Sequence, residues 1–336
     1  MTHRIGIVGY NTNSGIGGLT RDYKRHLPID THWCVRHAHH IRESHDIDAK
    51  CVFEDLSRGV TKSGWVDSLT QLIIVEVPFV HGLLERAFQR GIPIHCVVNA
   101  DWFNPKQPWW RMFTGWFICP NRLSVERVKA AGIAKIAYIP CCVDHNDFPF
   151  IKRTKAETFV FNNGWGGYDG RKGWRVVEQA FVGSGIPLIV NSQTPIALRE
   201  TKPSLSLRVG TLPKRSDLYA KGDIYLSPTK WEGHGLHLVE AMMSGMPVLT
   251  TDGEPMNEYV GPVSKDLLIP TPPPVDVFKG KMGARAYSVG MDALRERLAF
   301  WHRKDIAALS ELSRERAVST HSWQANTPKF LEVLGL

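Results

Sequence analysis

The sequence predicts an α/β protein made of two domains, each built around a parallel sheet. Short apolar runs alternate with amphipathic stretches along most of the chain, which is the pattern of strands connected by helices. Two tripeptides, Gly91-Ile92-Pro93 and Gly185-Ile186-Pro187, stand at matching places between an expected helix end and a buried strand. The length of 336 residues also favours two domains, because one domain usually takes about 150 residues.

The first domain is expected to span residues 1–150. The segment Asn13–Leu19 joins its first strand to a helix and contains the pair Gly17 and Gly18. This segment lacks the GxGxxG spacing, which disfavours dinucleotide binding. The expected strands of this domain are Ile5–Val8, Leu72–Val75, Ile94–Val98, Trp116–Cys119 and Ala137–Ile139.

The second domain is expected over residues 151–317, because polar and aromatic residues interrupt the strand pattern at Asp144–Ala156. The proline-rich stretch Pro270–Pro274 predicts a stiff surface segment after the last clear strand. Beyond it, Met291–Ala317 is rich in Arg, Glu, Leu and Ala and predicts one helix. The expected strands of this domain are Phe159–Phe161, Leu188–Val190, Leu207–Val209, Ile224–Leu226 and Pro247–Leu249.

The composition excludes several classes of protein. Hydrophobic residues make up 43% and charged residues 22% of the chain, which excludes general disorder. The formal charge of +8 is compatible with anionic partners such as nucleotide phosphates, DNA or an acidic membrane face. The six cysteines form no CxxC motif, and no stretch is apolar enough to span a bilayer or serve as a signal peptide. We therefore expect reduced cysteines and a cytoplasmic protein.

The most informative segment runs from Asp223 to Thr251. A buried strand leads into a loop in which Glu232 is followed by Gly233, His234 and Gly235, and a helix is expected from Leu236. Glycines let backbone N–H groups approach a ligand closely, and a helix N-terminus attracts anions. A second carboxylate, Glu240, follows two turns later. Two carboxylates around a glycine-rich helix start suit a ligand that carries both hydroxyls and phosphates.

This segment resembles the Glu-x7-Glu motif of retaining GT-B glycosyltransferases of the family 4 type. The matching residues are Ser227-Pro228, Glu232–Leu236, Glu240–Met242 and Gly245–Val248. The resemblance implies the GT-B fold, in which two Rossmann-like domains face a central cleft. It also implies transfer of a hexosyl group from a nucleoside-diphosphate sugar, such as a UDP-sugar, to an acceptor hydroxyl with retention of anomeric configuration.

Fainter matches extend the resemblance over nearly the whole chain. Ile139–Asp144 with Phe148 is similar to the family's interdomain segment, and Gly170–Gly173 is similar to its Lys-Gly segment. Ser322-Trp323 is similar to the Ser-Trp that precedes the last helix of the family. By this resemblance, residues 318–336 form a C-terminal helix that packs back on the N-terminal domain.

The resemblance also implies roles for individual residues. Glu240 would hold the ribose hydroxyls of the donor, and Lys172 would neutralise its diphosphate. Arg171 would replace an arginine that the family carries a few residues earlier. Glu232 would contact the donor sugar, helped by the amides of the loop that follows it. The backbone of Gly17 and Gly18 would approach the donor phosphate and the acceptor. The residues of that helix-start loop are Gly233, His234, Gly235 and Leu236.

One family feature is missing from the chain. Many members carry a His-Asp pair after a mid-domain strand, where this sequence has Val98-Asn99-Ala100-Asp101. Asn99 stands about where the histidine would be, and Asp101 is a candidate to orient the acceptor hydroxyl or accept its proton. In this family the leaving phosphate is thought to assist that deprotonation, so the missing histidine weakens the assignment of Asp101 more than that of the activity.

The sequence leaves two classes of acceptor possible. One is a glycan or glycolipid, and the other is a hydroxymethylated base in DNA of the phage type, which in a duplex would require base flipping. The alternatives to transfer are a sugar-nucleotide epimerase on the same fold and a non-catalytic binding protein. GT-B enzymes usually need no metal, so we expect neither a metal nor another cofactor.

Three weaker features have ordinary explanations beside functional ones. Asp46-Ile47-Asp48 has the DxD spacing of metal-dependent glycosyltransferases but lacks the strand context. His37, His39 and His40 lie close together in a polar segment and are compatible with a divalent metal. The aromatic and basic segment Trp102–Phe117 suits nucleic-acid stacking or a peripheral membrane contact, and equally suits core packing or cleft lining.

Overall fold

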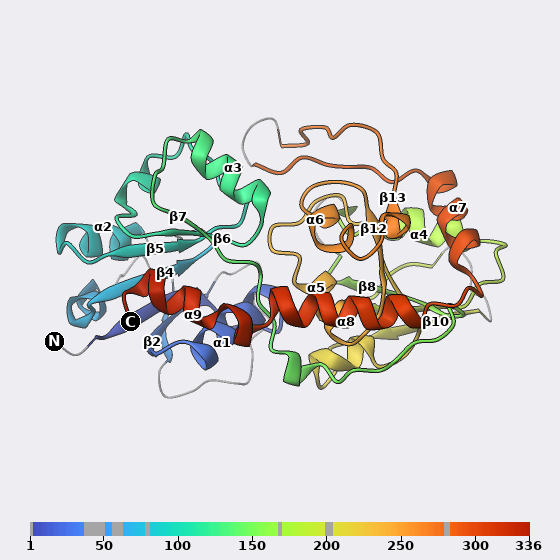
Figure 1. Ribbon diagram of the computed structural model, residues 1–336. Coiled ribbons are helices and arrows are strands. Elements are labelled where there is room, and N and C mark those ends of the chain that lie inside the picture. The colour runs from blue at the N-terminus through green and yellow to red at the C-terminus, as the bar shows by residue number, and fades with distance from the viewer. Residues whose placement is uncertain are drawn as a thin grey trace. The chain divides into compact units, whose positions relative to one another are not determined.

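The computed structural model describes residues 3–36, 51–55, 63–77, 81–166, 170–198, 204–278 and 283–336. Its chain divides into two compact units (Figure 1). Unit 1 comprises Met1–Pro140, Asn326–Leu336 and a short segment ending at Gly283. Unit 2 comprises Cys141–Lys279 and Ala284–Ala325. Each unit holds one parallel sheet, so the α/β class and the two Rossmann-like sheets expected from the sequence are confirmed.

Unit 1 contains a seven-stranded sheet in the order β3-β2-β1-β4-β5-β6-β7. The order reverses between β1 and β4, and right-handed crossovers then place the connecting helices on opposite faces. Figure 1 shows α3 on one side of this sheet and α1 on the other. The strands are β1 (Ile5–Tyr10), β2 (Ile29–Arg36), β3 (Cys51–Asp55), β4 (Gln71–Val75), β5 (Ile94–Val97), β6 (Phe117–Cys119) and β7 (Ile136–Tyr138). The helices are α1 (Gly15–His26), α2 (His81–Gln89) and α3 (Arg122–Ala130), with 3-10 turns η2 (Ser63–Ser68) and η3 (Pro108–Met112).

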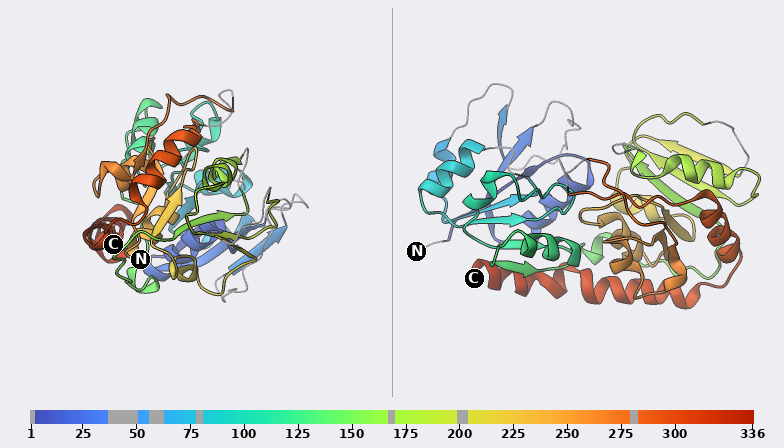
Figure 2. Two further views of the ribbon diagram at one scale, coloured as in Figure 1. Left: turned by 90° about the vertical axis from the view of Figure 1, so that its right-hand side faces the viewer. Right: turned by 90° about the horizontal axis from the view of Figure 1, so that it is seen from above.

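Unit 2 repeats this arrangement with six strands in the order β10-β9-β8-β11-β12-β13. Figure 2 shows α4 and α8 on opposite sides of the sheet. The strands are β8 (Phe159–Gly164), β9 (Leu188–Ser192), β10 (Leu205–Val209), β11 (Ile224–Ser227), β12 (Val248–Thr251) and β13 (Leu268–Ile269). The helices are α4 (Trp174–Phe181), α5 (Leu236–Met243), α6 (Met256–Val260), α7 (Met291–Trp301) and α8 (Ala307–His321). Helix α9 (Trp323–Leu334) begins in this unit, and its residues from Asn326 onward belong to unit 1. The 3-10 turns are η4 (His145–Asp147), η6 (Arg215–Tyr219) and η7 (Lys265–Leu267).

The last residues of the chain belong to unit 1. Within that unit the ring of Phe330 meets the ring of Tyr23 edge-on, with centroids 5.3 Å apart. The Gln71 side chain donates to the carbonyl of Leu334 at 2.8 Å, and the His95 imidazole bonds Gln71 in turn at 3.1 Å. A buried polar chain therefore ties the end of α9 to β4 and β5.

All ten strands expected from apolar runs are present, but the sequence pattern missed β2, β3 and β13. Strand β2 was missed because it carries Asp30, Thr31 and His32 between its apolar residues. The single helix expected over Met291–Ala317 is wrong. It is two helices, because the turn between them binds another segment: Arg303 N–H donates to Ala156 O at 2.7 Å and Ile306 N–H to Thr154 O at 3.0 Å. Among the described residues, no helix has the length and apolar character that a bilayer crossing requires.

Candidate functional site

The candidate donor site lies at the switch point of the unit 2 sheet. Strands β8 and β11 are neighbours there, and their connecting helices leave in opposite directions. Ligands of open parallel sheets bind beyond the carboxyl ends of the strands at such a point. The loop after β8 carries Arg171 and Lys172, and the loop after β11 carries Glu232. The fold therefore brings together two motifs that are 60 residues apart in the sequence.

Glu232 is the centre of a buried charge cluster. Its Oε1 lies 2.7 Å from Lys172 Nζ and 3.1 Å from the Arg171 guanidinium, and it accepts a hydrogen bond from Thr229 Oγ1 at 3.1 Å. Burial on its own would raise the pKa of Glu232, but the charges of Arg171 and Lys172 outweigh it and hold the pKa well below its usual range. Glu232 is therefore ionised, with two cations beside it.

His237, on the first turn of α5, completes this cluster. Its Nε2 lies 3.3 Å from both Lys172 Nζ and Glu232 Oε1, and 3.1 Å from Ser227 Oγ. Burial, together with the charge of Lys172, lowers the pKa of His237 to about 3. The imidazole is therefore neutral near pH 7 and offers Lys172 a lone pair.

Two glycines with positive φ build the loops that carry these side chains. Gly173 (φ +79°) caps α4, and a Cβ there would lie 2.7 Å from the Pro228 carbonyl. Gly235 (φ +69°) caps α5, and a Cβ there would lie 2.7 Å from the ring of Tyr259. Both positions need glycine for conformation and for space. At Gly173 the loop that carries Lys172 packs closely against Pro228, and the Lys230 N–H donates to the Arg171 carbonyl at 2.8 Å, so the two loops are joined there.

The second carboxylate of the motif, Glu240, is buried in the second turn of α5. The Arg215 guanidinium, from the 3-10 turn η6, donates to Oε1 through two nitrogens, with Nε at 3.1 Å. The hydroxyl of Tyr219 donates to Oε2 at 2.9 Å, and burial raises the pKa of Tyr219 well above its usual range, which keeps it a donor. The carboxylate is thus fixed in position by two groups of one turn.

A buried arginine anchors this turn to the end of α5. Arg153 donates to the carbonyls of Tyr219 (2.5 Å), Ile151 (2.6 Å) and Ser244. Burial lowers the pKa of Arg153 to about 10, so it remains charged at neutral pH. Its cation also lies against the negative end of the α5 dipole, and it holds η6 and α5 in register around Glu240.

The glycine pair of the first loop belongs to unit 1. Gly17 lies in the first turn of α1, and a Cβ there would lie 2.0 Å from the carbonyl oxygen of Thr12. Ser14 caps the helix, and the Gly18 N–H donates to the Ser14 carbonyl at 2.9 Å. Packing within the loop therefore explains Gly17, and its predicted contact with the donor stays a prediction, as does that of Gly18.

Asp101 is buried beyond the carboxyl end of β5. Its backbone N–H donates to Asn99 Oδ1 at 2.9 Å, and the Asn99 amide donates to Glu76 Oε1 at 2.7 Å. Glu76 follows β4 and holds a positive φ of 68°, a strained conformation that is common at functional sites. Glu76 was not among the candidates from the sequence. It is the acidic residue that accepts the hydrogen bond of Asn99 at the carboxyl edge of the unit 1 sheet.

The segment Trp102–Phe117 forms mainly a packed aromatic core. Phe103, Trp110, Phe113 and Phe117 are buried, with ring centroids between 4.8 and 6.3 Å apart along the cluster. Trp102 and Trp116 are each 36% exposed. Core packing accounts for most of this segment. The expected features at Asp46-Ile47-Asp48 and at His37, His39 and His40 lie outside the described residues.

The sequence missed four residues of the donor-site cluster: Thr229, His237, Arg215 and Tyr219. A signal existed for His237, a polar residue three positions before Glu240 in an otherwise apolar helix. Arg215 and Tyr219 lie on a short turn without a pattern of its own. Only the fold places them next to Glu240.

Comparisons with known proteins show what the sequence and the fold of this chain resemble. Residues 209–282, which include Arg215, Glu232 and Glu240, match the model of the family described as glycosyl transferases group 1. A segment of 108 residues is 31% identical to the MMP alpha-(1->4)-mannosyltransferase of Mycolicibacterium hassiacum. This segment covers 32% of the chain and 23% of that protein, so the match spans about a quarter of the relative.

Solved structures match over almost the whole chain at low identity. The Anabaena protein HepE in complex with UDP and glucose has a TM-score of 0.71 at 12% identity, with 99% of this chain and 100% of that chain covered. Sucrose-phosphate synthase from Thermosynechococcus elongatus has a TM-score of 0.67 at 12% identity, covering 99% and 98%. The chain therefore has the GT-B fold of these proteins, as the sequence predicted, and carries the group 1 glycosyl transferase pattern over residues 209–282.

Proposed function

We propose that this chain is a retaining glycosyltransferase that moves a hexose from a nucleoside-diphosphate sugar, a UDP-sugar in the first instance, to a carbohydrate hydroxyl. One observation carries the proposal: Lys172 and Arg171 meet Glu232 at the switch point of the unit 2 sheet. Glu232 lies in the segment that matches the glycosyl transferase family, and the two cations come from a loop outside that segment. This cluster supplies positive charge for a diphosphate and a carboxylate for sugar hydroxyls.

The donor site works by exchange of partners. Without ligand, Glu232 binds both cations. A donor diphosphate would compete for Lys172 and Arg171, and Glu232 would then accept from hydroxyls of the donor sugar. Glu240 keeps its contacts with Arg215 and Tyr219. Because a carboxylate has about four lone-pair sites, Glu240 can still accept from the ribose hydroxyls.

The reaction replaces one bond at the anomeric carbon by another. The bond between that carbon and the phosphate oxygen breaks, and its electron pair leaves with the nucleoside diphosphate. The acceptor oxygen forms the new bond from the same face, and its proton passes to the leaving phosphate. Lys172 and Arg171 stabilise the negative charge that develops on the diphosphate. Their charge supplies what a metal ion would provide, so we propose transfer without a metal cofactor.

The acceptor we propose is a carbohydrate. The relatives support this choice: one is named for α-(1→4)-mannosyl transfer and another for sucrose-phosphate synthesis. A DNA acceptor would use the exposed rings of the Trp102–Phe117 segment, but of its aromatic side chains only those of Trp102 and Trp116 are exposed, at 36% each. The six cysteines form no CxxC motif, and we propose a reducing cytoplasm as the place of the reaction.

Product analysis tests the proposal directly. The chain is incubated with a panel of nucleotide sugars, first alone and then with sugar, lipid-linked or hydroxymethylated DNA acceptors, and products are identified by mass spectrometry. We expect a sugar-acceptor adduct and a released nucleoside diphosphate, with the donor's anomeric configuration retained in the NMR spectrum. Isomerisation of the donor in the absence of an acceptor would indicate an epimerase instead. Modification of the DNA would show that the acceptor is a nucleic acid and not a carbohydrate. No turnover with any donor would contradict the proposal.

Variants then assign the turnover to this site. We expect Lys172→Ala and Glu240→Ala to lower kcat/KM for the donor by about 100-fold or more, the range seen when a group that stabilises developing charge is removed. The matched control is Lys152→Ala, because Lys152 forms an ion pair with Glu311 on the surface of the same unit, with its side chain 50% exposed. Unchanged rates in both site variants would disprove the assignment.

A further inference from the structure

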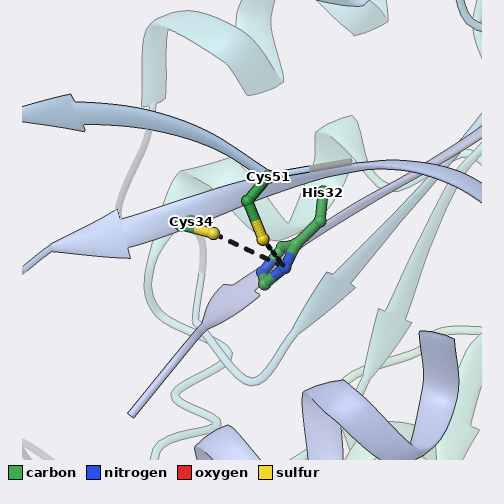
Figure 3. A group of neighbouring side chains, drawn as sticks. All are labelled: His32, Cys34 and Cys51. Carbon is green, nitrogen blue, oxygen red and sulfur yellow. Dashed lines mark hydrogen bonds between the residues drawn. The ribbon is translucent and has the colours of Figure 1, made fainter. Parts of the chain in front are cut away.

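Three potential metal ligands lie together at the edge of the unit 1 sheet. His32 and Cys34 are two positions apart on β2 and therefore point to the same face. Cys51 begins β3 and stands directly opposite His32 in the parallel register. Figure 3 shows the two sulfur atoms directed at the imidazole of His32 from the two strands. His32 and Cys34 are buried and Cys51 is half-buried.

The hydrogen bonds of His32 fix which nitrogen faces the sulfurs. Its Nε2 lies 3.1 Å from the carbonyl oxygen of Gly9, and since a carbonyl only accepts, Nε2 carries the proton. The unprotonated Nδ1 then lies 3.5 Å from Cys34 Sγ and 3.6 Å from Cys51 Sγ. This is the arrangement of a metal-binding histidine, which usually donates its second N–H to a carbonyl or carboxylate.

These distances match tetrahedral zinc coordination. With Zn–S of about 2.3 Å and Zn–N of about 2.0–2.1 Å, tetrahedral angles place the nitrogen and each sulfur about 3.6 Å apart. The three ligand atoms all lie within 4.8 Å of one another. Lys24 Nζ donates to Cys51 Sγ at 3.5 Å, which places a positive charge beside a sulfur that carries a negative charge when it binds metal.

We infer that His32, Cys34 and Cys51 bind a thiophilic divalent ion of the zinc class. Hydrogen bonding alone explains the cluster less well, because one Nδ1 lone pair would serve two thiols, whereas an ion bonds each of the three atoms. Thiolate and imidazole are the ligands that zinc prefers. The three residues supply three ligands, so at least one position of a four-coordinate ion is left for another ligand.

The ion would act structurally, by fixing an edge strand. Strand β3 is the last of its sheet and pairs only with β2 within the described sheet. A metal bound to Cys51 on β3 and to two residues on β2 joins these strands through side chains as well as backbone. All three ligands belong to unit 1, whereas the Glu232 cluster belongs to unit 2.

Metal titration of the full chain tests the inference. The protein is reduced, freed of metal and titrated with Zn²⁺ against a chromophoric chelator, and with Co²⁺ as a spectroscopic probe of thiolate ligation. We expect one Zn²⁺ per chain, a sulfur-to-cobalt charge-transfer band, and a higher Tm with zinc than with chelator. Cys51→Ser, at the half-buried position, should weaken Zn²⁺ binding by about 100-fold or more, since even supporting residues of such sites contribute 10–100-fold.

Cys96→Ser is the matched control, because Cys96 is buried in the same sheet and its thiol bonds the Glu76 carbonyl. It should bind zinc like the unaltered chain. Cys34→Ser provides a second ligand variant, and circular dichroism verifies that each variant is folded. Equal zinc affinity of Cys51→Ser and the unaltered chain overturns the inference. Failure of the reduced protein to bind zinc also overturns the inference. It does so even if Cys34 and Cys51 form a disulfide when the protein is exposed to air.

Discussion

Lys172 shares its ammonium between a carboxylate and an imidazole. Glu232 holds it by charge at 2.7 Å, and His237 accepts from it at 3.3 Å. A lysine has three donors, and these two contacts fix the direction of the amine. The orientation of this lysine therefore depends on a residue that belongs to no recognised motif.

Substitutions of His237 test this positioning role. His237→Phe removes the acceptor for Lys172 and should raise KM for the donor about 10-fold or more, since hydrogen bonds to charged groups contribute about 1.5–3 kcal/mol. His237→Gln retains an acceptor and should stay within a few-fold of the unaltered chain. Because the pKa of His237 is lowered to about 3, the imidazole is neutral from pH 5 to 8, and neither substitution should remove a limb of the pH profile in that range. Equal rates for the Phe and Gln variants would contradict the role.

Residue by residue, the sequence identified members of the candidate site where a motif links residue type to spacing. Glu232, Gly235 and Glu240 stand at fixed intervals around one helix start, so a single segment reveals them. Thr229 and His237 were missed although they lie within the same segment, because their role depends on side-chain direction. Arg215 meets Glu240 only through the packing of η6 on α5, and no local pattern contains that information.

At the scale of elements, the loop before α4 depends on one glycine. Gly173→Ala would combine a left-handed backbone with a Cβ 2.7 Å from the Pro228 carbonyl. The left-handed conformation costs about 1–2 kcal/mol for a residue with a Cβ, and the contact adds to that cost by pushing the loop of Arg171 and Lys172 away from β11. We expect Gly173→Ala to lower both the free energy of unfolding and kcat/KM.

The matched control for this element is Gly183→Ala. Gly183 has a similar φ of +74°, lies just after α4, and a Cβ there would meet nothing within 4 Å. It should show the conformational cost alone, as a decrease of about 1–2 kcal/mol in urea unfolding, with kcat/KM unchanged. If both alanine variants lose equal stability and activity, the contact with Pro228 does not position the loop.

Strands were predictable where apolar residues dominate them. Strands β1 and β4 are mostly apolar and were predicted on that ground, and β5 was predicted although it buries His95 among its apolar residues. Strand β2 buries His32 and Thr31 among apolar residues. Because these side chains are polar, the sequence does not show the apolar run by which the other strands were recognised. The break between α7 and α8 results from backbone hydrogen bonds to residues 154–156, which lie more than 140 positions away and leave no local signal.

At the scale of the whole molecule, burial strongly lowers the pKa of three histidines in the described part of the chain. Burial lowers the pKa of His95 to about 4, that of His237 to about 3 and that of His321 to about 4. His95 receives a hydrogen bond from the Trp116 N–H and bonds Gln71, and His321 bonds the carbonyl of Cys141. Protonation of these imidazoles is unfavourable in the folded state. We therefore expect acid to lower the stability of both units.

The consequence is a loss of stability between pH 6.5 and pH 4. In the unfolded chain a histidine binds a proton near pH 6.5, whereas in the fold these three bind it only near pH 4 or below, so the unfolded state holds more protons in this window. The free energy of unfolding therefore falls as the pH falls, by up to about 1.4 kcal/mol per pH unit for each histidine. His95→Gln should reduce that slope by about one proton relative to the unaltered chain. Urea unfolding followed by tryptophan fluorescence at several pH values measures both slopes. An unaltered slope in His95→Gln would show that His95 is not among the groups that make the fold sensitive to acid.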